Sequence, residues 1–109
     1  SYYSPKLKYT TNISGSWNIY TLDETMGADS SIAIDSNNKV HISYMGGSGA
    51  GQLKYVTNTL GPWLTSTLSI TREELTAIVI DSNNNIHISS YSFKGYNDGD
   101  ITYTTDSGN

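Results

Sequence analysis

The 109-residue sequence has no cysteine, a single arginine, a single phenylalanine and two prolines. Without cysteine, the chain can form no disulfide bond, no cysteine-ligated zinc site and no thiol nucleophile. Only 15% of the residues are charged, six Lys and Arg against ten Asp and Glu, and the formal net charge is -4. This balance offers no basic surface, so we expect no nucleic acid as a partner.

Long hydrophobic runs are also missing. The longest run falls far below the roughly 18 residues that a membrane span needs, and the N-terminus lacks the charged and then apolar regions of a signal peptide. We therefore expect no membrane span and a soluble chain. The sequence starts at Ser1 without a methionine, as a processed product or an excised segment would.

Uncharged polar residues are abundant instead: Ser, Thr and Asn fill 39 of the 109 positions, beside nine tyrosines and two tryptophans. Disordered chains favour charge and avoid aromatic residues, whereas threonine and aromatic residues suit strands with one solvated face. The composition predicts one small β-rich domain, or a piece of a larger repetitive one.

A repeat of 46 residues organises the chain. Residues 7–46 align with residues 53–92 without a gap, and 19 of the 40 pairs are identical. The shared blocks read LKYxTNxxGxW, IDSNN and HIS. A third unit opens at Ile101, and the given sequence ends at Asn109, before the position of its Trp.

Each unit contains four strand patterns separated by turn residues. In the first unit the expected strands are 7–11, 17–23, 32–34 and 40–44, with turns at 12–16 and 35–38 and a loop at 24–30. The short aliphatic strand 32–34 is expected to be covered on both faces.

Four strands per 46 residues predict an all-β fold of β-propeller blades, each with four antiparallel strands. We expect roughly 2.4 repeats in an open arrangement: a partial blade in 1–30, a complete blade in 31–69 and a partial blade in 76–109. Closed propellers have about 4 to 8 blades. The predicted partners are therefore further blades of the same chain or identical copies, in a ring or a filament.

The LKYxTNxxGxW, IDSNN and HIS blocks resemble the repeat of large bacterial secreted β-propeller proteins, and the resemblance covers nearly the whole chain from Leu7 onward. It implies an extracellular or cell-surface repeat module. A weaker likeness is to small bacterial and fungal lectins that assemble a propeller from two-blade chains and bind sugars between blades. Their binding motifs are not matched here, so no site residue is carried over.

Two sets of polar residues recur at equivalent positions: Asp35, His41 and Ser43, and Asp81, His87 and Ser89. A Ser-His-Asp catalytic set is the alternative interpretation. An active site is normally unique, however, and these sets repeat. We therefore predict a structural hydrogen-bond network and no catalytic residue, because buried polar groups need partners.

The turns at 35–38 and 81–84 look like the start of a calcium loop, but they lack its glycine at position six and its glutamate at position twelve. Residues 97–100 form another oxygen-rich cluster that a turn explains equally well. We predict no metal and no cofactor.

Trp17 and Trp63 follow turns that resemble the Asp-box turn of sialidase-type propellers, whose aromatic residue packs within the blade; we predict that packing role for both. Candidate stacking contacts to a sugar are the non-repeated Tyr20, Tyr91 and Tyr96. The triplet 12–14 matches an N-glycosylation sequon.

The leading functional interpretation is a non-enzymatic extracellular scaffold, adhesion or assembly module, because every polar constellation repeats. The alternative is a lectin with glycans as partners, marked by aromatic and acidic residues that converge at each blade junction. A glycosidase would need two unique inward carboxylates, for which Asp23, Glu24, Glu73 and Glu74 are poor candidates.

Overall fold

The computed structural model describes residues 6–47, 51–69, 73–95 and 98–105. These ranges contain nine strands and no helix, and hence no helix that could cross a membrane. The strands are β1 (Leu7–Thr11), β2 (Asn18–Asp23), β3 (Ala28–Ile34), β4 (Val40–Gly46), β5 (Gln52–Thr57), β6 (Leu64–Ser69), β7 (Glu73–Ile80), β8 (Ile86–Gly95) and β9 (Asp98–Thr105).

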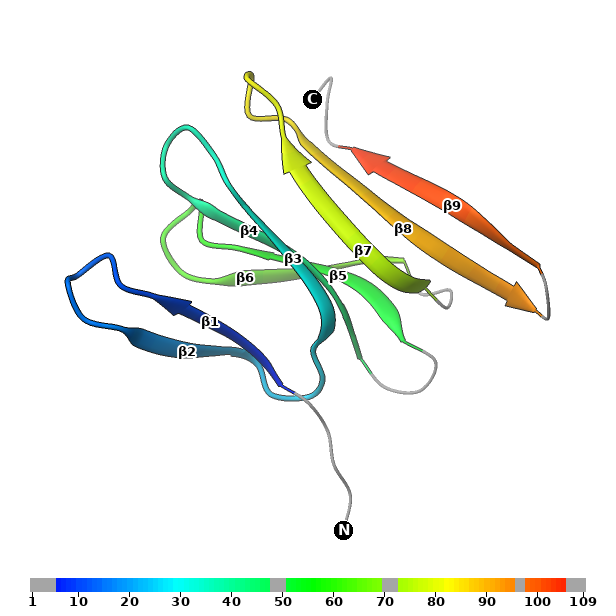
Figure 1. The fold of residues 1–109 in the computed structure, drawn as a ribbon, viewed down its shortest axis with the longest axis horizontal. Coiled ribbons are helices and arrows are strands. Elements are labelled where there is room, and N and C mark those ends of the chain that lie inside the picture. Colours follow the sequence, from blue (N-terminus) through cyan, green and yellow to red (C-terminus); the bar gives the residue numbers. More distant parts are fainter. Residues whose placement is uncertain (1–5, 48–50, 70–72, 96–97, 106–109) are drawn as a thin grey trace, which may run out of the picture.

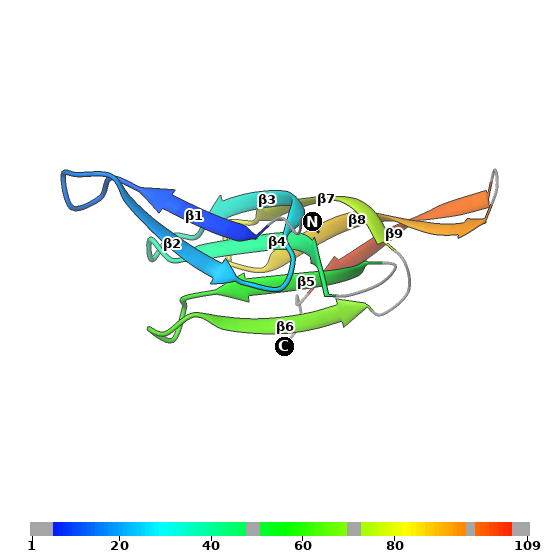
Figure 2. The same cartoon turned by 90° about the horizontal axis from the view of Figure 1, so that it is seen from below.

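The strands form three antiparallel sheets that follow the chain order (Figure 1). The first sheet is β1-β2, the middle sheet is β3-β4-β5-β6 and the last sheet is β7-β8-β9. The prediction of an all-β antiparallel fold is confirmed. In the part of the chain that the structure describes, the sheets are not closed into a ring, and the molecule is flat, with extents of 47 × 44 × 18 Å (Figure 2).

The repeated hairpin turns follow from their Asp and Asn residues. The Asp35 carboxylate accepts the backbone N–H groups of Asn37 and Lys39 at 2.8 and 3.0 Å, and Asp81 binds its own turn in the same way. Asn38 and Asn84 have φ values of 63° and 65°. Asparagine tolerates this left-handed backbone better than most residues, so both turns stay tight.

The strand β3 begins earlier than expected, because Ala28 pairs with Met45 across an irregularity in the register before Ser31. The residues 24–30, which we expected to form a loop, therefore contribute the first part of this strand. Asp29 lies within the irregular segment at φ 47°.

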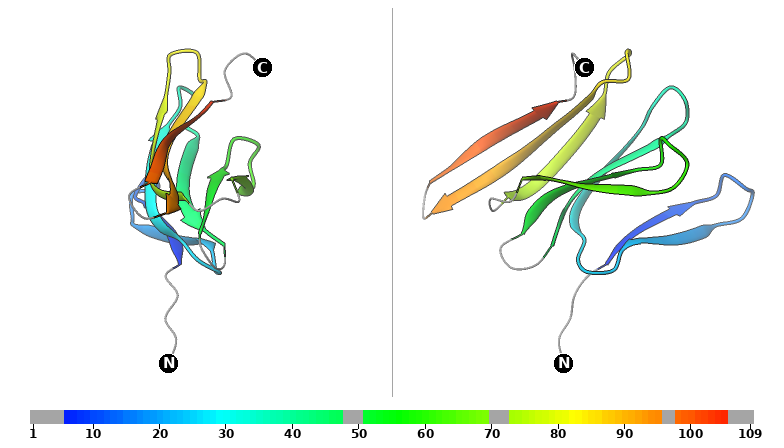
Figure 3. Two further views of the ribbon diagram at one scale, coloured as in Figure 1. Left: turned by 90° about the vertical axis from the view of Figure 1, so that its right-hand side faces the viewer. Right: turned by 180° about the vertical axis from the view of Figure 1, so that it is seen from behind.

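Two apolar clusters join the three sheets, whose strands are seen from two further sides in Figure 3. The first joins the first and middle sheets through Leu7, Val40, Ile42, Tyr44 and Val56, with Tyr9, Leu22 and Trp63 packed against it. The second joins the middle and last sheets through Met45, Leu53, Ile78 and Ile88, with Ala33, Tyr55 and Ile86 packed against it. Each sheet therefore contributes side chains to the interface with its neighbour.

Burial of the aliphatic strand depends on which sheet lies beside it. Ile78 of β7 is 5% exposed because it packs against the middle sheet. Its repeat counterpart, Ile32 of β3, is 52% exposed, and Ile34 is 53% exposed. The expectation that 32–34 is covered on both faces is wrong, because the first sheet contributes only β1 and β2 to the described structure and they leave these isoleucines open.

Candidate functional site

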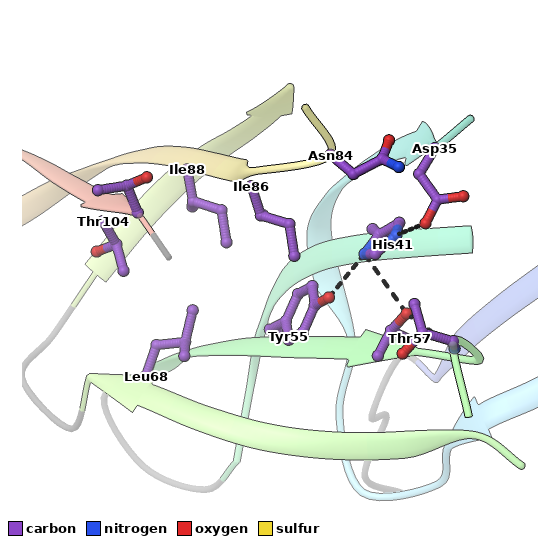
Figure 4. Close-up of a pocket in the computed structure, with 11 residues that line it drawn as sticks. Asp35, His41, Tyr55, Thr57, Leu68, Asn84, Ile86, Ile88 and Thr104 are labelled. Carbon is purple, nitrogen blue, oxygen red and sulfur yellow. Dashed lines mark hydrogen bonds and ion pairs between the residues drawn. The ribbon is translucent and has the colours of Figure 1, made fainter. Parts of the chain in front are cut away.

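A largely buried hydrogen-bond network surrounds His41; we call it the His41 network, and it comprises Asp35, His41, Tyr55 and Thr57 (Figure 4). The Nε2 atom of His41 lies 2.8 Å from Oδ2 of Asp35, and its Nδ1 atom lies 2.6 Å from the Tyr55 hydroxyl. The Thr57 hydroxyl lies 3.4 Å from the same Nδ1 atom and donates to the Val40 carbonyl at 2.7 Å. His41 is 3% exposed.

These contacts constrain the protons of the His41 ring. A carboxylate only accepts, so Nε2–H donates to Asp35. The Thr57 proton is used by the Val40 carbonyl, so the Tyr55 hydroxyl is the donor to Nδ1 when that nitrogen carries no proton. Both ring nitrogens are thus engaged inside the protein.

The His87 network repeats this arrangement with Asp81, Tyr103 and Thr105. His87 lies 2.9 Å from Asp81, 2.6 Å from the Tyr103 hydroxyl and 3.3 Å from the Thr105 hydroxyl. The histidine and tyrosine rings stack at 5.9 Å in both networks. The difference is exposure: the side chains of His87 and Asp81 are 24% and 38% exposed, against 4% and 7% for His41 and Asp35.

The hydrogen bonds favour the charged form of both aspartates. The bond from His41 is the main cause that lowers the pKa of Asp35, and backbone N–H groups of Lys39 and Asn37 add to it. The bond from His87 and the N–H of Asn85 lower the pKa of Asp81 to about 2. Both networks therefore keep an ionised carboxylate at neutral pH.

The serines that the sequence grouped with these histidines lie elsewhere. The Ser43 hydroxyl accepts a hydrogen bond from the Thr76 hydroxyl of β7 at 2.9 Å, so it links the middle and last sheets and does not bind His41. Ser89 is exposed on β8. Residues 41 and 43 share one face of β4, but two residue positions along the strand separate them. The His41 ring also turns toward Asp35, and so away from Ser43.

The tyrosine and threonine of each network were not predicted from the sequence. Cross-strand pairing supplies them, since His41 pairs with Thr57 on β5 and His87 pairs with Thr105 on β9. The signal was present in the LKYxT block, where Tyr55 and Thr57 recur in the next unit as Tyr103 and Thr105.

A pocket of about 440 Å³ opens between the middle and last sheets, and we call it the junction pocket. Figure 4 shows Ile86 and Ile88 of β8 on one side and Tyr55 and Leu68 on the other. Its lining residues are Asp35, His41, Tyr55, Thr57, Thr59, Leu68, Asn84, Ile86, Ile88, Thr104 and Thr105. The His41 network therefore forms one end of a largely apolar pocket.

The proposed sugar-stacking tyrosines do not line this pocket. Tyr20 is 45% exposed and stacks on Tyr9 at 5.9 Å. Tyr91 is half-buried and lines a separate, shallow surface on the last sheet. Tyr96 lies outside the described residues.

The two tryptophans differ in their surroundings although they are equivalent in the repeat. Trp63 is half-buried and its ring centroid lies 5.3 Å from that of Tyr9 in the first sheet. Trp17 is 69% exposed. Trp63 thus packs against the neighbouring first sheet, whereas Trp17 is open; packing within the blade stays a prediction for both.

Two of the carboxylates weighed for a glycosidase, Asp23 and Glu24, have other partners. Burial alone would raise the pKa of Asp23, but hydrogen bonds from Thr25 and Tyr44 lower it overall. Tyr44 donates to Asp23 at 2.6 Å and so joins the first and middle sheets. Glu24 pairs with Lys6 at 3.4 Å on the surface. The side chain of Glu73 lies outside the described part of the structure.

Among the described residues, no group of three His, Cys, Asp or Glu side chains is arranged to hold a metal ion. Comparisons with known families, curated proteins and solved structures found no match.

Proposed function

We propose that the chain is a non-enzymatic repeat module of the β-propeller type, which serves as a scaffold, adhesion or assembly unit at the cell surface or outside the cell. The extracellular location is inferred from the resemblance of the LKYxTNxxGxW repeat. The assembly role is inferred from the surfaces at the two ends of the stack of sheets. In a propeller, each sheet packs its faces against the two neighbouring sheets.

One observation carries this proposal: equivalent residues are buried between sheets and exposed at the ends. Leu53, between the middle and last sheets, is 1% exposed, while its counterpart Ile101 on the last sheet is 77% exposed. Around Ile101, the outer face of the last sheet also exposes Leu75, Val79 and Tyr103, at 65%, 62% and 62%. Such an apolar face marks an interaction surface, and the chain itself shows that a sheet of the same repeat covers the equivalent face.

The non-enzymatic part of the proposal is supported by the two histidine networks. Both nitrogens of His41 and His87 have protein partners, and a general base needs a nitrogen within reach of substrate. The networks bind the turn after β3 or β7 to the third strand of the same sheet. In the proposed module, the networks fix the first hairpin turn of each sheet to its third strand.

A lectin is the second candidate, because Tyr55 and Asp35 converge at the junction between the middle and last sheets. The oxygens of Asp35 are already bonded to His41, Asn37 and Lys39, so a sugar would contact mainly the Tyr55 ring and the apolar side chains of the pocket. Titration with a panel of oligosaccharides, followed by tyrosine and tryptophan fluorescence, tests this candidate. Saturable binding that Tyr55→Ala removes would favour the lectin.

The assembly role is tested by substitution on the outer face of the last sheet. Val79→Asp should reduce self-association of the 109-residue chain, because a charge cannot be buried between sheets without a partner. Leu60→Asp is the control, since Leu60 is 77% exposed in the turn before β6. Light scattering during gel filtration measures the mass of each variant. Equal masses for both variants and the wild type would contradict the proposal.

A further inference from the structure

The strands β1 and β9 are the same strand of the repeat. Tyr9, Thr10 and Thr11 of β1 recur as Tyr103, Thr104 and Thr105 of β9. β1 pairs with β2 through these residues, with Tyr9 opposite Tyr20, Thr10 opposite Ile19 and Thr11 opposite Asn18. In the described structure, β9 is the last strand of its sheet and pairs with β8.

We propose that β9 of one copy of the chain replaces β1 of a second copy and pairs with the second copy's β2. This inference rests on the proposed assembly function and specifies its interface. The exchange gives a four-stranded sheet, β7-β8-β9 from one copy and β2 from the other. That strand number matches the middle sheet, β3-β4-β5-β6.

The exposed residues of β9 match the buried residues of β1. Leu7 is 4% exposed and packs against Val40, Ile42 and Tyr44 of the middle sheet. Its counterpart Ile101 is 77% exposed. After exchange, Ile101 and Tyr103 take the positions of Leu7 and Tyr9 against the middle sheet of the second copy.

The same exchange covers the open isoleucines of β3. A shallow pocket lined by Leu7, Tyr9, Ile32 and Ile42 lies beside β1 on the middle sheet. When the last sheet of another copy replaces β1, its strands β7 and β8 lie over Ile32 and Ile34. These residues then become buried, as Ile78 is inside the chain.

The junction pocket receives a tryptophan in this arrangement. Trp63 precedes β6 and packs 5.3 Å from Tyr9 of the preceding sheet. When β2 of the second copy extends the last sheet, its Trp17 reaches the equivalent position against Tyr55 in the junction pocket. The pocket, at about 440 Å³, lies in the range that holds drug-sized ligands and has room for an indole ring.

Each copy donates β9 and accepts a strand at β2, so the contact is head-to-tail. Because β9 and β1 are equivalent strands of the repeat, the pairing of β1 with β2 within the chain is reproduced between chains, and β1 of the accepting copy is displaced from β2. A head-to-tail contact closes into a ring or continues as a filament, according to the rotation between copies.

The test uses Trp17 as the reporter of its own burial. Trp63→Phe leaves Trp17 as the one tryptophan of the chain. As this variant is concentrated, its tryptophan emission should shift to shorter wavelength together with the rise in mass seen by sedimentation. Addition of Ile101→Asp should weaken association by at least about tenfold and remove the shift, because the new charge would be buried in the position of Leu7.

The matched control is Leu60→Asp, since Leu60 and Ile101 are equally exposed at 77%. It should change neither association nor emission. Self-association without a shift of the Trp17 emission, or equal effects of Ile101→Asp and Leu60→Asp, would overturn the strand exchange and leave the assembly role standing. A constant monomer mass, or a shift produced by added oligosaccharide without a mass change, would overturn both.

Discussion

His41 and His87 make the same three contacts, but the His41 side chain is more deeply buried than the His87 side chain. His41 is closed in by the last sheet, whereas His87 belongs to the last sheet and has a more open side chain, 24% exposed. The energetic value of a hydrogen-bonded group rises when its loss leaves buried partners unsatisfied. The two sites therefore form an internal comparison of one network in two environments.

We predict that His41→Ala lowers the free energy of unfolding by about 1–3 kcal/mol, because Asp35 and Tyr55 each lose a hydrogen-bond partner in a buried site. His87→Ala should cost less, since water can reach Asp81 and Tyr103. Urea unfolding of both variants in dilute solution measures the two values. A larger cost for His87→Ala would contradict the assigned burial.

The low pKa of Asp81 predicts a loss of stability in acid. The folded chain lowers this pKa from 3.8 to about 2, so the contribution is complete above about pH 4 and is lost as the pH falls toward 2. Asp81→Asn should flatten the dependence of the unfolding free energy on pH in that window. Asp29→Asn, an exposed substitution outside both networks, is the control, and an equal slope in wild type and Asp81→Asn would argue against the assignment.

At the scale of single elements, the two hairpin turns share a left-handed asparagine but differ in the contacts of its side chain. Asn38 and Asn84 are both left-handed, but the Asn84 side chain also bonds to Ser36 of the neighbouring turn at 2.7 Å. The Asn84 side chain thus joins its own turn to the turn that contains Asn38, and so links two sheets.

Asn38→Val should destabilise the chain by about 1–2 kcal/mol, because a β-branched residue is strained at positive φ. Asn38→Gly should have little effect, since glycine adopts this conformation freely. Thermal or urea unfolding measures both. If the two variants were equally stable, the left-handed backbone at position 38 would not determine which residues that position accepts.

Some features of these elements could be predicted from the sequence, and others could not. The turns were predictable because Asp, Asn and Gly have local conformational reasons to be there, and the alternation of Val40, Ile42 and Tyr44 marks a strand without any knowledge of its neighbours. The start of β3 was not predictable, because Ala28 joins the strand through pairing with Met45. The Tyr55–His41 contact also depends on cross-strand register, which local pattern does not specify.

At the scale of the whole molecule, burial depends on the neighbouring sheet and not on residue type. Leu53 and Ile101, or Ile78 and Ile32, are chemically alike and occupy the same repeat position, yet their exposures differ by tens of per cent. Sequence predicted the repeat that makes these pairs equivalent. It could not predict which member of each pair is covered, because that depends on how the sheets stack.

The central claim is that these end surfaces bind further sheets of the same repeat. Native mass spectrometry of the wild-type 109-residue chain over a range of concentrations tests it most directly. The account predicts folded species at multiples of 11.9 kDa, whose proportion rises with concentration. A folded chain that remains at 11.9 kDa at every concentration, with Ile32 and Ile101 still exposed, would contradict it.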